Sequence, residues 1–342
     1  MKKAKVAING FGRIGRAFLK LAEGNDSLEV VAINDLGNLE NLAYLLKYDS
    51  VYGESALQIA VKEGVLVVEG REIVFLSERE PEKLPWKDMD IDIVLEATGI
   101  FASYEKSRVH LTAGAKRVVI SAPVKDAPPS DINGATVLIG VNEAQLQTCD
   151  ISSNASCTTN AGSPVVAILE EAVGIEKALL NTVHGYTSTQ SLVDSPNAKD
   201  FRKGRAAAQN IIPTSTGAAI ATTKAIPSLE GNFDGIAIRV PVVAGSIVDI
   251  TFIAKRDVTP EEINEILTKA SQEERWKGVF SVTTEPIVSS DILGNTHASI
   301  ADLSMTRVVG GNLVKVLSWY DNEMGYTSAL VQHVAKSAQY IS

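Results

Sequence analysis

The stretch Val6-Ala7-Ile8-Asn9-Gly10-Phe11-Gly12-Arg13-Ile14-Gly15 places a short apolar strand directly before three glycines and the start of a helix. Glycines at this spacing allow a tight turn, let the backbone approach a pyrophosphate, and let the helix pack closely on the strand. A second apolar segment, residues 28–34, ends in Asp35, which lies 20 residues after Gly15. An acidic residue at about that distance binds the adenosine ribose in dinucleotide-binding folds. The order of these features predicts a βαβ unit that binds NAD through Gly10, Gly12, Gly15 and Asp35.

The charge at position 35 also bears on which dinucleotide is bound. A carboxylate accepts hydrogen bonds from both ribose hydroxyls but repels a 2′-phosphate, so we expect NAD in preference to NADP. Lys47 and Arg79 are cations that would favour the 2′-phosphate, although nothing in the sequence places them beside Asp35. Arg79 is kept as a candidate cofactor-binding residue.

The first half of the chain alternates strand and helix patterns, which is typical of an α/β protein with a parallel sheet. The expected strands cover residues 5–9, 28–34, 91–95, 117–120 and 136–139, and the expected helices cover residues 13–21 and 38–48. Shorter runs at residues 57–63, 65–68 and 72–75 are broken by Gly64 and Gly70 and predict an inserted meander. Residues 1–156 are therefore expected to form a Rossmann-type, doubly wound parallel sheet.

After Cys157 the pattern changes to strands that follow one another without intervening helices. Expected here are a helix over residues 163–173, a polar functional loop over 187–204, strands over 236–240, 246–254, 303–308 and 313–318, and a last helix over 326–338. Another helix is opened by Thr259-Pro260-Glu261-Glu262, with Thr259 as the N-cap and proline at the first position. Residues 157–322 are therefore expected to form an α+β catalytic domain, whose mostly antiparallel sheet is covered by helices on one side.

The bulk composition limits the function classes. The 342 residues exceed the size at which one core usually stops growing, so two domains are expected. The net charge of −9, without a long basic run, disfavours nucleic acid and anionic membranes as partners. The sequence shows neither a signal peptide nor an apolar run long enough to span a bilayer, so we expect a cytoplasmic protein. Two cysteines and four histidines without close spacing predict neither a disulfide framework nor a metal site.

Cys157 is the candidate nucleophile. It precedes the helix expected from residue 163, and a thiol near a helix N-terminus is biased toward the thiolate. His184 follows an apolar strand and precedes the polar loop, 27 residues further along the chain, so it is the candidate base. Spacing alone leaves the pair unproven, because a lone cysteine or histidine is more often structural. Cys149 lies beside Asp150, which would raise the pKa of the thiol, and is assigned no chemistry.

Four segments resemble the glyceraldehyde-3-phosphate dehydrogenase family. They are residues 9–16 (Asn-Gly-Phe-Gly-Arg-Ile-Gly-Arg), 155–160 (Ala-Ser-Cys-Thr-Thr-Asn), 212–219 (Ile-Pro-Thr-Ser-Thr-Gly-Ala-Ala) and 318–323 (Ser-Trp-Tyr-Asp-Asn-Glu). They follow the family's order and span nearly the whole chain, and Ser-Cys-Thr-Thr-Asn is the most specific of them. The resemblance implies that Cys157 forms a thioester with a phosphorylated aldehyde and that His184 activates the thiol. It further implies that NAD is reduced and that inorganic phosphate releases an acyl phosphate.

The resemblance also implies which residues bind the ligands. The substrate's phosphate would be bound by Thr187 and Arg239, and inorganic phosphate by Ser156, Thr158, Thr216 and Gly217. Lys203 stands beside Arg202 where many bacterial members carry a second arginine; it keeps the charge but lacks the bidentate fork. NAD would be bound by Arg13 and Ile14 at the pyrophosphate, Thr98 and Ser121 at strand ends, and Asn322 at the nicotinamide carboxamide. The resemblance implies that a C-terminal helix within residues 323–342 completes the NAD domain, and that the chain forms a homotetramer.

Other functions stay open on the sequence. The same architecture would serve an erythrose-4-phosphate dehydrogenase or an enzyme acting on an amino-acid semialdehyde, although Thr187 and Arg239 disfavour the semialdehydes. An NAD-binding regulatory protein without catalysis is the alternative from another class. The intact Cys157 and His184 speak against it.

Overall fold

The computed structural model describes residues 2–198 and 200–341, which divide into two compact units. The first unit comprises the residues up to Val137, Glu143–Ala155 and the residues from Leu330 onward. The second unit comprises Leu138–Asn142 and Ser156–Ala329. Within the described ranges, no helix has both the length and the apolar character needed to cross a membrane. The functional domain boundaries expected at residues 156 and 322 stay a prediction.

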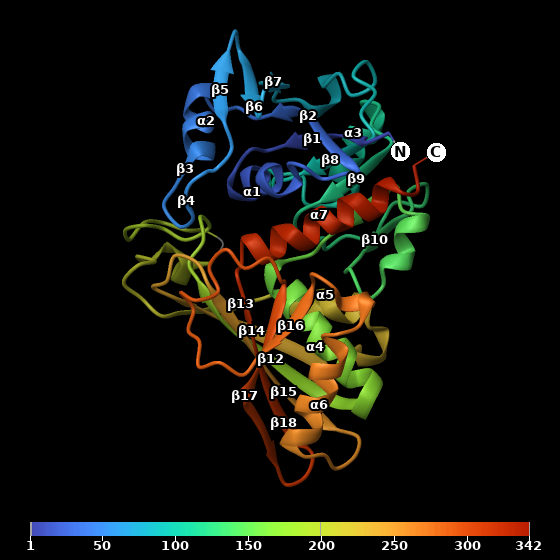
Figure 1. The fold of residues 1–342 in the computed structure, drawn as a ribbon, viewed down its shortest axis with the longest axis vertical. Coiled ribbons are helices and arrows are strands. Elements are labelled where there is room, and N and C mark those ends of the chain that lie inside the picture. The colour runs from blue at the N-terminus through green and yellow to red at the C-terminus, as the bar shows by residue number, and fades with distance from the viewer. Residues whose placement is uncertain (1, 199, 342) are drawn as a thin grey trace. The chain divides into compact units, whose positions relative to one another are not determined.

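A nine-stranded sheet forms the centre of the first unit, with the strand order β10-β11-β9-β8-β1-β2-β7-β6-β5 (Figure 1). Every pairing from β10 to β7 is parallel, and only the β7-β6-β5 edge is antiparallel. The strands are β1 Ala4–Asn9, β2 Leu28–Asn34, β5 Ile59–Lys62, β6 Val65–Val68, β7 Arg71–Leu76, β8 Ile93–Glu96, β9 Arg117–Ile120, β10 Gly134–Thr136 and β11 Ile151–Ser153. The helices are α1 Arg13–Ala22, α2 Leu39–Lys47 and α3 Tyr104–Thr112, together with the part of α7 (Met324–Ala338) from Leu330. A separate two-stranded sheet pairs β3 Tyr48–Asp49 with β4 Gly53–Glu54.

The central strands of this sheet are buried on both faces. Residues 6–8 of β1 and 93–95 of β8 are apolar and have no exposed surface. Continuous apolar runs of this kind are what a parallel sheet covered on both sides requires. Because the strands are parallel, their carboxyl ends meet at one edge, where Asn9 of β1 is the register partner of both Asn34 and Glu96. That edge is where ligands bind in open α/β sheets.

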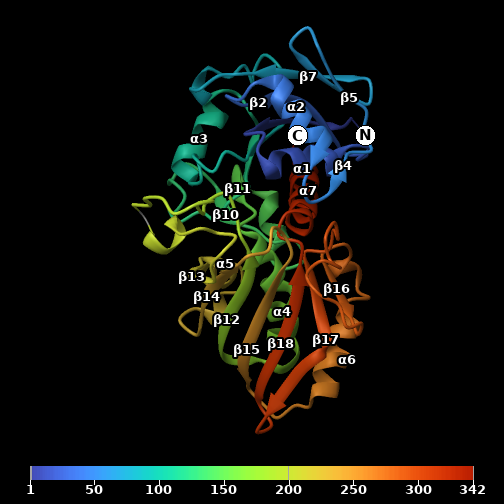
Figure 2. The same cartoon turned by 90° about the vertical axis from the view of Figure 1, so that its left-hand side faces the viewer.

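The second unit is built on a seven-stranded sheet with the order β13-β14-β12-β15-β18-β17-β16, shown in Figure 2. Four of its six pairings are antiparallel; β12 with β14 and β16 with β17 are the parallel pairs. The strands are β12 Ile175–Gly185, β13 Ile212–Ser215, β14 Phe233–Val240, β15 Ser246–Ala254, β16 Phe280–Thr283, β17 Ser299–Val309 and β18 Leu313–Tyr320. The helices are α4 Cys157–Val173, α5 Ala218–Ala225 and α6 Pro260–Ala270. Short 3-10 helices occur at Pro81–Lys83, Glu143–Gln147, Phe201–Gly204, Pro227–Leu229 and Glu274–Trp276.

Helices cover one face of this second sheet. Every second residue of β15, from Ser246 to Ala254, is buried, and α4 lies against β12, β15, β17 and β18. The opposite face exposes large apolar side chains, namely Leu179, Ile236, Met305, Val309 and Leu313. A parallel Rossmann-type sheet followed by a mostly antiparallel sheet with helices on one side is the fold class expected from the sequence, and it is confirmed.

Several elements differ from the sequence predictions. The strand expected at residues 136–139 is β10, Gly134–Thr136, because the apolar residues 137–139 enter a buried turn in which Leu138 N–H donates to Asn142 Oδ1 (2.8 Å). The expected meander is present as the antiparallel strands β5, β6 and β7, and its last strand also joins the main sheet by pairing in parallel with β2. Helix α3 was not predicted because two of its three buried residues, Ser107 and His110, are polar and leave no apolar stripe. Among the other elements, β13, α5 and β16 were also missed.

The helix expected from residue 163 begins six residues earlier, at Cys157. Proline at residue 164 suggested a first turn, whereas the helix start is set by Ser156, whose Oγ accepts the Thr159 N–H (3.1 Å). The expected N-cap of α6 is confirmed: Thr259 Oγ1 accepts the Glu262 N–H at 3.2 Å.

Candidate active site

The thiol of Cys157 lies at the first position of α4, directly after the N-cap Ser156. The first N–H groups of a helix have no partner within the helix, and together with the helix dipole they stabilise an anion there. Cys157 is half-buried, so its sulfur is held in place and keeps some access. The buried Cys149 differs, because burial raises the pKa of its thiol to about 11.

His184 and Arg239 are brought together by strand register. They are partners near the carboxyl ends of the parallel strands β12 and β14, so their side chains project from the same face. His184 Nε2 lies 3.3 Å from Cys157 Sγ. On the other side of the ring, Nδ1 lies 2.6 Å from the Gly185 carbonyl oxygen and 2.7 Å from Nη1 of Arg239. The thiol, the imidazole and the guanidinium thus form one continuous chain of contacts.

The groups around Nδ1 determine whether Nε2 of His184 accepts or donates a hydrogen bond. A guanidinium only donates, so Nδ1 either accepts from Arg239 or carries a proton that it donates to Gly185. Arg239 Nη1 has Gly185 oxygen as an alternative acceptor at 3.1 Å. We assign the proton to Nδ1, because Nε2 is then the acceptor that faces the thiol. Burial and the adjacent guanidinium lower the pKa of His184 to about 3, which keeps the ring neutral at pH 7.

Opposing effects act on the thiol itself. Burial raises the pKa of Cys157, whereas the charge of Arg239 and the backbone N–H groups of Thr158 and Cys157 oppose that rise. The resting pair is therefore a thiol that donates to a neutral imidazole. The proton is poised to move as soon as an electrophile draws electrons from the sulfur.

Tyr320 supports this pair and was not found by sequence reasoning as a site residue. Its ring packs edge-on against His184, with centroids 5.8 Å apart. Its hydroxyl contacts Oγ1 of Thr158 (3.0 Å) and of Thr182 (2.7 Å), which ties the first turn of α4 to β12. Two signals in the sequence point to it: its place in the segment 318–323 that resembles the family, and the alternation of β18, which puts Tyr320 on the buried face.

The remaining expected phosphate ligands lie within their own loops. Thr187 Oγ1 contacts Thr189 Oγ1 (2.9 Å), and the Thr187 N–H donates to Gln190 (3.3 Å). Lys203 forms an ion pair with Asp200 at 3.8 Å. Thr216 and Gly217 form the N-terminus of α5, which a hydroxyl contact between Ser163 and Thr222 (2.9 Å) joins to α4. These contacts join Cys157, His184, Arg239 and Thr158 into one cluster, and the other phosphate ligands stay predictions.

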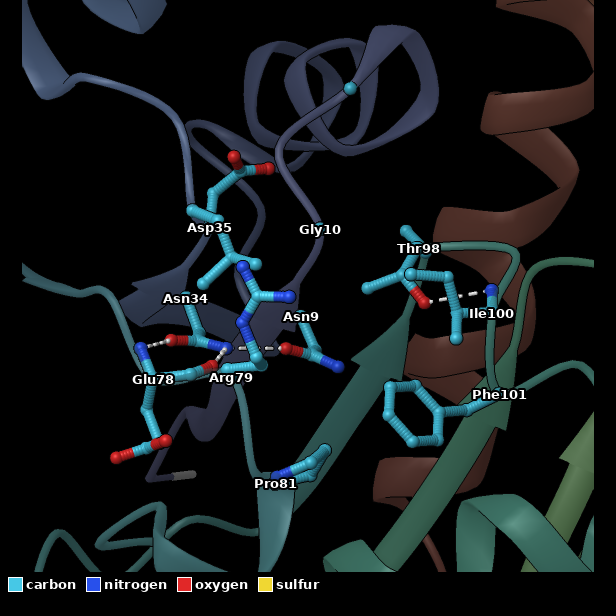
Figure 3. A pocket seen from close by; sticks show the side chains of 13 residues that line it. Asn9, Gly10, Asn34, Asp35, Glu78, Arg79, Pro81, Thr98, Ile100 and Phe101 are labelled. Carbon is cyan, nitrogen blue, oxygen red and sulfur yellow. Dashed lines mark hydrogen bonds between the residues drawn. The ribbon is translucent and has the colours of Figure 1, made fainter.

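A cavity of about 470 Å³ lies at the carboxyl edge of the first unit's sheet. Figure 3 shows its walls: Asp35 and Arg79 on one side, Thr98, Ile100 and Phe101 on the other, with Gly10 between them. Its lining residues are Asn9, Gly10, Gly12, Asn34, Asp35, Leu36, Glu78, Arg79, Pro81, Ala97, Thr98, Ile100 and Phe101. Leu36, Glu78, Pro81, Ile100 and Phe101 were missed by sequence reasoning. The sequence signal for these residues was their position, because each lies a few residues after the carboxyl end of β2, β7 or β8.

The three glycines of the motif have different surroundings, and these fit a bound pyrophosphate. A Cβ at Gly10, where φ is +97°, would lie 2.6 Å from the Thr98 nitrogen, and a Cβ at Gly15 would lie 2.3 Å from the Gly10 oxygen. These two positions require glycine for the turn and for helix packing. Gly12 has no protein atom within 4 Å of such a Cβ, so its backbone faces open space at the N-terminus of α1. A helix N-terminus with an uncovered glycine is a suitable site for phosphate.

Two backbone N–H groups hold the carboxylate of Asp35 in a position that suits ribose binding. Its Oδ2 accepts the Phe11 N–H (2.7 Å) and its Oδ1 accepts the Gly37 N–H (2.8 Å). A carboxylate has about four acceptor positions, so capacity for two ribose hydroxyls remains. Arg79, kept as a candidate cofactor-binding residue, lines the same cavity as Asp35, a proximity that the sequence did not indicate. The donor set and the cavity fit NAD.

Five expected cofactor residues lie outside the cavity lining, and one of them is Gly15, whose close approach to the Gly10 oxygen is described above. Arg13 pairs with Asp49 (2.6 Å), and Ile14 follows it on α1. Ser121 Oγ donates to the Glu96 carbonyl oxygen (3.0 Å). Asn322, in the second unit, accepts at Oδ1 from Gly245 N–H (3.0 Å) and Ser246 Oγ (3.1 Å). Their contacts with the cofactor stay predictions.

Comparisons with known proteins agree with the resemblance seen in the sequence. Residues 4–104 match the family model described as glyceraldehyde 3-phosphate dehydrogenase, NAD binding domain, and residues 156–322 match that of the C-terminal domain. The glyceraldehyde-3-phosphate dehydrogenase of Borreliella burgdorferi is 47% identical over 97% of this chain and 99% of its own. That of Clostridium pasteurianum is 48% identical over 96% of both chains, and glyceraldehyde-3-phosphate dehydrogenase 1 of Candida glabrata is 46% identical over 96% of this chain and 98% of its own. The chain belongs to the glyceraldehyde-3-phosphate dehydrogenase family.

Proposed function

We propose that this chain oxidises glyceraldehyde 3-phosphate to 1,3-bisphosphoglycerate, using NAD and inorganic phosphate, through a thioester on Cys157. The observation that carries the proposal is the 3.3 Å contact between Cys157 Sγ and His184 Nε2 at the N-terminus of α4. A thiol beside a base is the arrangement of an activated nucleophile. In the cell this reaction belongs to glycolysis and gluconeogenesis.

The first step forms a bond between sulfur and the aldehyde carbon. As the sulfur attacks, the thiol proton passes to His184 Nε2, and the carbonyl oxygen becomes an oxyanion. The Cys157 backbone N–H and the newly protonated imidazole are the donors that stabilise this oxyanion. Proton transfer then gives a neutral hemithioacetal.

The second step makes the thioester. His184 takes the hydroxyl proton while the carbon loses a hydride, so the aldehyde carbon is oxidised by two electrons. NAD, when bound, supplies the acceptor for that hydride. An oxygen of inorganic phosphate then attacks the thioester carbon and the Cys157 thiolate leaves, which releases the acyl phosphate. The thiolate takes back the proton that His184 holds, and the resting thiol and neutral imidazole are restored.

Charged and hydroxyl groups on this chain would hold the two phosphates. Arg239 and Thr187 suit the substrate's phosphate, because a guanidinium and a hydroxyl are good donors to phosphate oxygens. Ser156, Thr158, Lys203, Thr216 and Gly217 are the proposed ligands of inorganic phosphate. Gly10, Gly12, Arg13, Ile14, Gly15, Asp35, Arg79, Thr98, Ser121 and Asn322 are the proposed ligands of NAD.

The proposed assembly is a cytoplasmic homotetramer. Its support in this chain is the uncovered face of the second sheet, on which Leu179 and Ile236 are 65% and 52% exposed. A continuous apolar face of this kind is more typical of a subunit interface than of a free surface. Light scattering coupled to size-exclusion chromatography should give four times the 36.5 kDa of one chain, and a monomer would contradict the proposal.

The decisive experiment follows NADH formation from glyceraldehyde 3-phosphate and from erythrose 4-phosphate, each with and without inorganic phosphate. We expect rapid turnover of glyceraldehyde 3-phosphate that depends on inorganic phosphate. Preference for erythrose 4-phosphate would identify the rival dehydrogenase. A protein that binds NAD but oxidises neither sugar would be a non-catalytic regulator.

A further inference from the structure

A buried polar chain runs along the carboxyl edge of the first unit's sheet. It consists of Trp86, His110, Glu96, Asn9 and Asn34, and is called the edge ladder below. Each member is at most 5% exposed. Polar groups this deeply buried persist in a fold only when they are hydrogen-bonded. None of them takes part in the chemistry proposed for Cys157.

Glu96 is the centre of the edge ladder. Its Oε1 accepts the backbone N–H of Thr98 (2.8 Å) and the Thr98 hydroxyl. Its Oε2 accepts from Asn9 Nδ2 (2.6 Å) and from His110 Nε2 (3.1 Å). Four donors converge on this carboxylate. They replace the hydrogen bonds that water would make to an exposed carboxylate, and so offset the free-energy cost of burying its charge.

The protonation of His110 follows from its other neighbour. The indole N–H of Trp86 points to His110 Nδ1 at 3.2 Å, and an indole nitrogen only donates. Nδ1 is therefore the acceptor, and the single ring proton is on Nε2, facing Glu96. Asn9 Nδ2 also lies 3.4 Å from His110 Nε2; both atoms carry protons and converge on the same carboxylate oxygen. Glu96 is thus an anion whose ring partner is a neutral donor.

The other end of the edge ladder reaches the opposite side of the cavity. Asn9 Oδ1 accepts from Asn34 Nδ2 (2.8 Å). Asn34 in turn bonds the backbone of Glu78 twice, donating to its oxygen (3.0 Å) and accepting from its N–H (2.8 Å). Figure 3 shows these bonds between Asn9, Asn34 and Glu78, beside Arg79 and Pro81.

The edge ladder therefore connects the two walls of the dinucleotide cavity. On one wall Glu96 fixes Thr98, whose hydroxyl also accepts the Ile100 N–H (3.0 Å). On the other wall Asn34 fixes the segment that begins at Glu78. We propose that Glu96 is a positioning residue for NAD: it sets the separation of the two walls through Asn9 and Asn34, and His110, oriented by Trp86, holds it in place.

The test is a comparison of NAD dissociation constants by calorimetry. Glu96→Gln keeps the shape but turns one acceptor oxygen into an NH2 donor, which then faces other donors. We expect the dissociation constant for NAD to rise about tenfold or more, in line with the loss of hydrogen bonds to a charged group. The KM for NAD should rise as well, while kcat at saturating NAD and the KM for glyceraldehyde 3-phosphate stay within about twofold.

Trp86→Phe removes one N–H and keeps the ring packing, so it tests the edge ladder even if Glu96→Gln does not fold. We expect NAD binding to weaken by about two- to fivefold, the effect of one neutral hydrogen bond. Selective 15N labelling of histidine should then show His110 in two tautomers instead of one. Unchanged NAD binding in Trp86→Phe would overturn the proposal.

His333→Gln is the matched control. His333 is as buried as His110 and lies in the same unit, where it contacts Ser152 (2.7 Å) and Asn154 (3.1 Å), neither of which lines the cavity. We expect it to lower the melting temperature without changing NAD affinity. Equal weakening of NAD binding in this control, or binding within twofold of the parent in Glu96→Gln, would refute the role of the edge ladder. The inference rests on NAD being the cofactor of the proposed function, and a parent protein that fails to bind NAD would refute that function instead.

Discussion

The two sites each contain a buried histidine at the carboxyl end of parallel strands, but the partners of the two rings have opposite charges. His110 in the first unit faces the carboxylate of Glu96, whereas His184 in the second unit lies against the guanidinium of Arg239. The anion needs a donor, so His110 is held as a neutral donor with its proton on Nε2. The cation disfavours a second charge, so His184 is held as a neutral acceptor toward Cys157. Burial and the Arg239 charge together keep His184 neutral, and the partners of each ring decide which nitrogen carries the proton.

The two sites also differ in how firmly they are built. Every member of the edge ladder except the terminal Trp86 has side-chain hydrogen bonds to two neighbours, as a binding site that must stay in one shape requires. Cys157 and His184 are joined by one S···N contact, which has to break in each reaction cycle. Substitutions should therefore affect cofactor binding at the first site and chemical rate at the second.

Cys157→Ser is expected to have the largest effect. It should also distinguish the two sites most clearly, because it should lower turnover and leave NAD binding intact. A serine hydroxyl is a far weaker nucleophile at neutral pH than the thiol, so turnover should fall by a factor on the order of 10⁴ or more. NAD binding should stay unchanged, because the cofactor cavity is lined entirely by residues of the other unit. Steady-state NADH formation measures the first quantity, and calorimetric titration with NAD measures the second. Substantial activity in the serine variant would show that another group forms the covalent intermediate.

His184→Asn should have the second largest effect. Removal of a general base typically lowers the rate by a factor of about 10²–10⁴. Alkylation of Cys157 by iodoacetamide should be slower than in the parent at pH 7 and should recover as the pH is raised, since hydroxide then replaces the base. An unchanged alkylation rate at pH 7 would mean that the imidazole does not accept the thiol proton.

The sequence was sufficient for features that are fixed locally. The glycine motif and Asp35 predicted the nucleotide-binding edge. Each glycine is needed for a local reason, either a tight turn or close packing, and the spacing of the glycines in the sequence already indicates it. The N-cap of α6 was predicted for the same reason. Cys157 was found through a short specific segment, although the sequence predicted the helix to begin at residue 163, six residues after the start that Ser156 sets.

Features that depend on strand register could not be predicted from the sequence. His184 and Arg239 are 55 residues apart and meet only because β12 and β14 pair in parallel. The edge ladder likewise needs the order of β8, β1 and β2, and its His110 lies on a helix whose weak apolar pattern hid it. Tyr320 lies in the segment 318–323 that resembles the family, but nothing in that segment shows that its hydroxyl contacts Thr158 and Thr182. Which strands pair depends on the packing of the whole sheet, so no single segment of the sequence predicts these pairings.

The smallest expected effect concerns stability, and it extends the comparison to a third buried histidine. Among the described residues His333 has no charged partner, and burial lowers its pKa from the ordinary value of 6.5 to about 3 against the opposing effect of a hydrogen bond with the Val137 backbone. In the unfolded chain the ring takes up a proton below pH 6.5, whereas in the folded chain it stays neutral down to about pH 3. Its contribution to stability is therefore complete above pH 6.5 and is lost as the pH falls through that window, at up to about 1.4 kcal/mol per pH unit.

His333→Gln should make the protein less stable at pH 7.5, by about 1 kcal/mol for a lost hydrogen bond, and less sensitive to acid. Between pH 6.5 and pH 5 the parent should lose about 2 kcal/mol more than the variant, which scanning calorimetry would record as a shallower fall in melting temperature. His184→Asn should flatten the same limb, because the pKa of His184 is also lowered to about 3. Parallel pH profiles for the parent and His333→Gln would mean that His333 becomes protonated without unfolding. Burial without a charged neighbour would then not be enough to keep a ring neutral, and the neutrality of His184 would depend on Arg239.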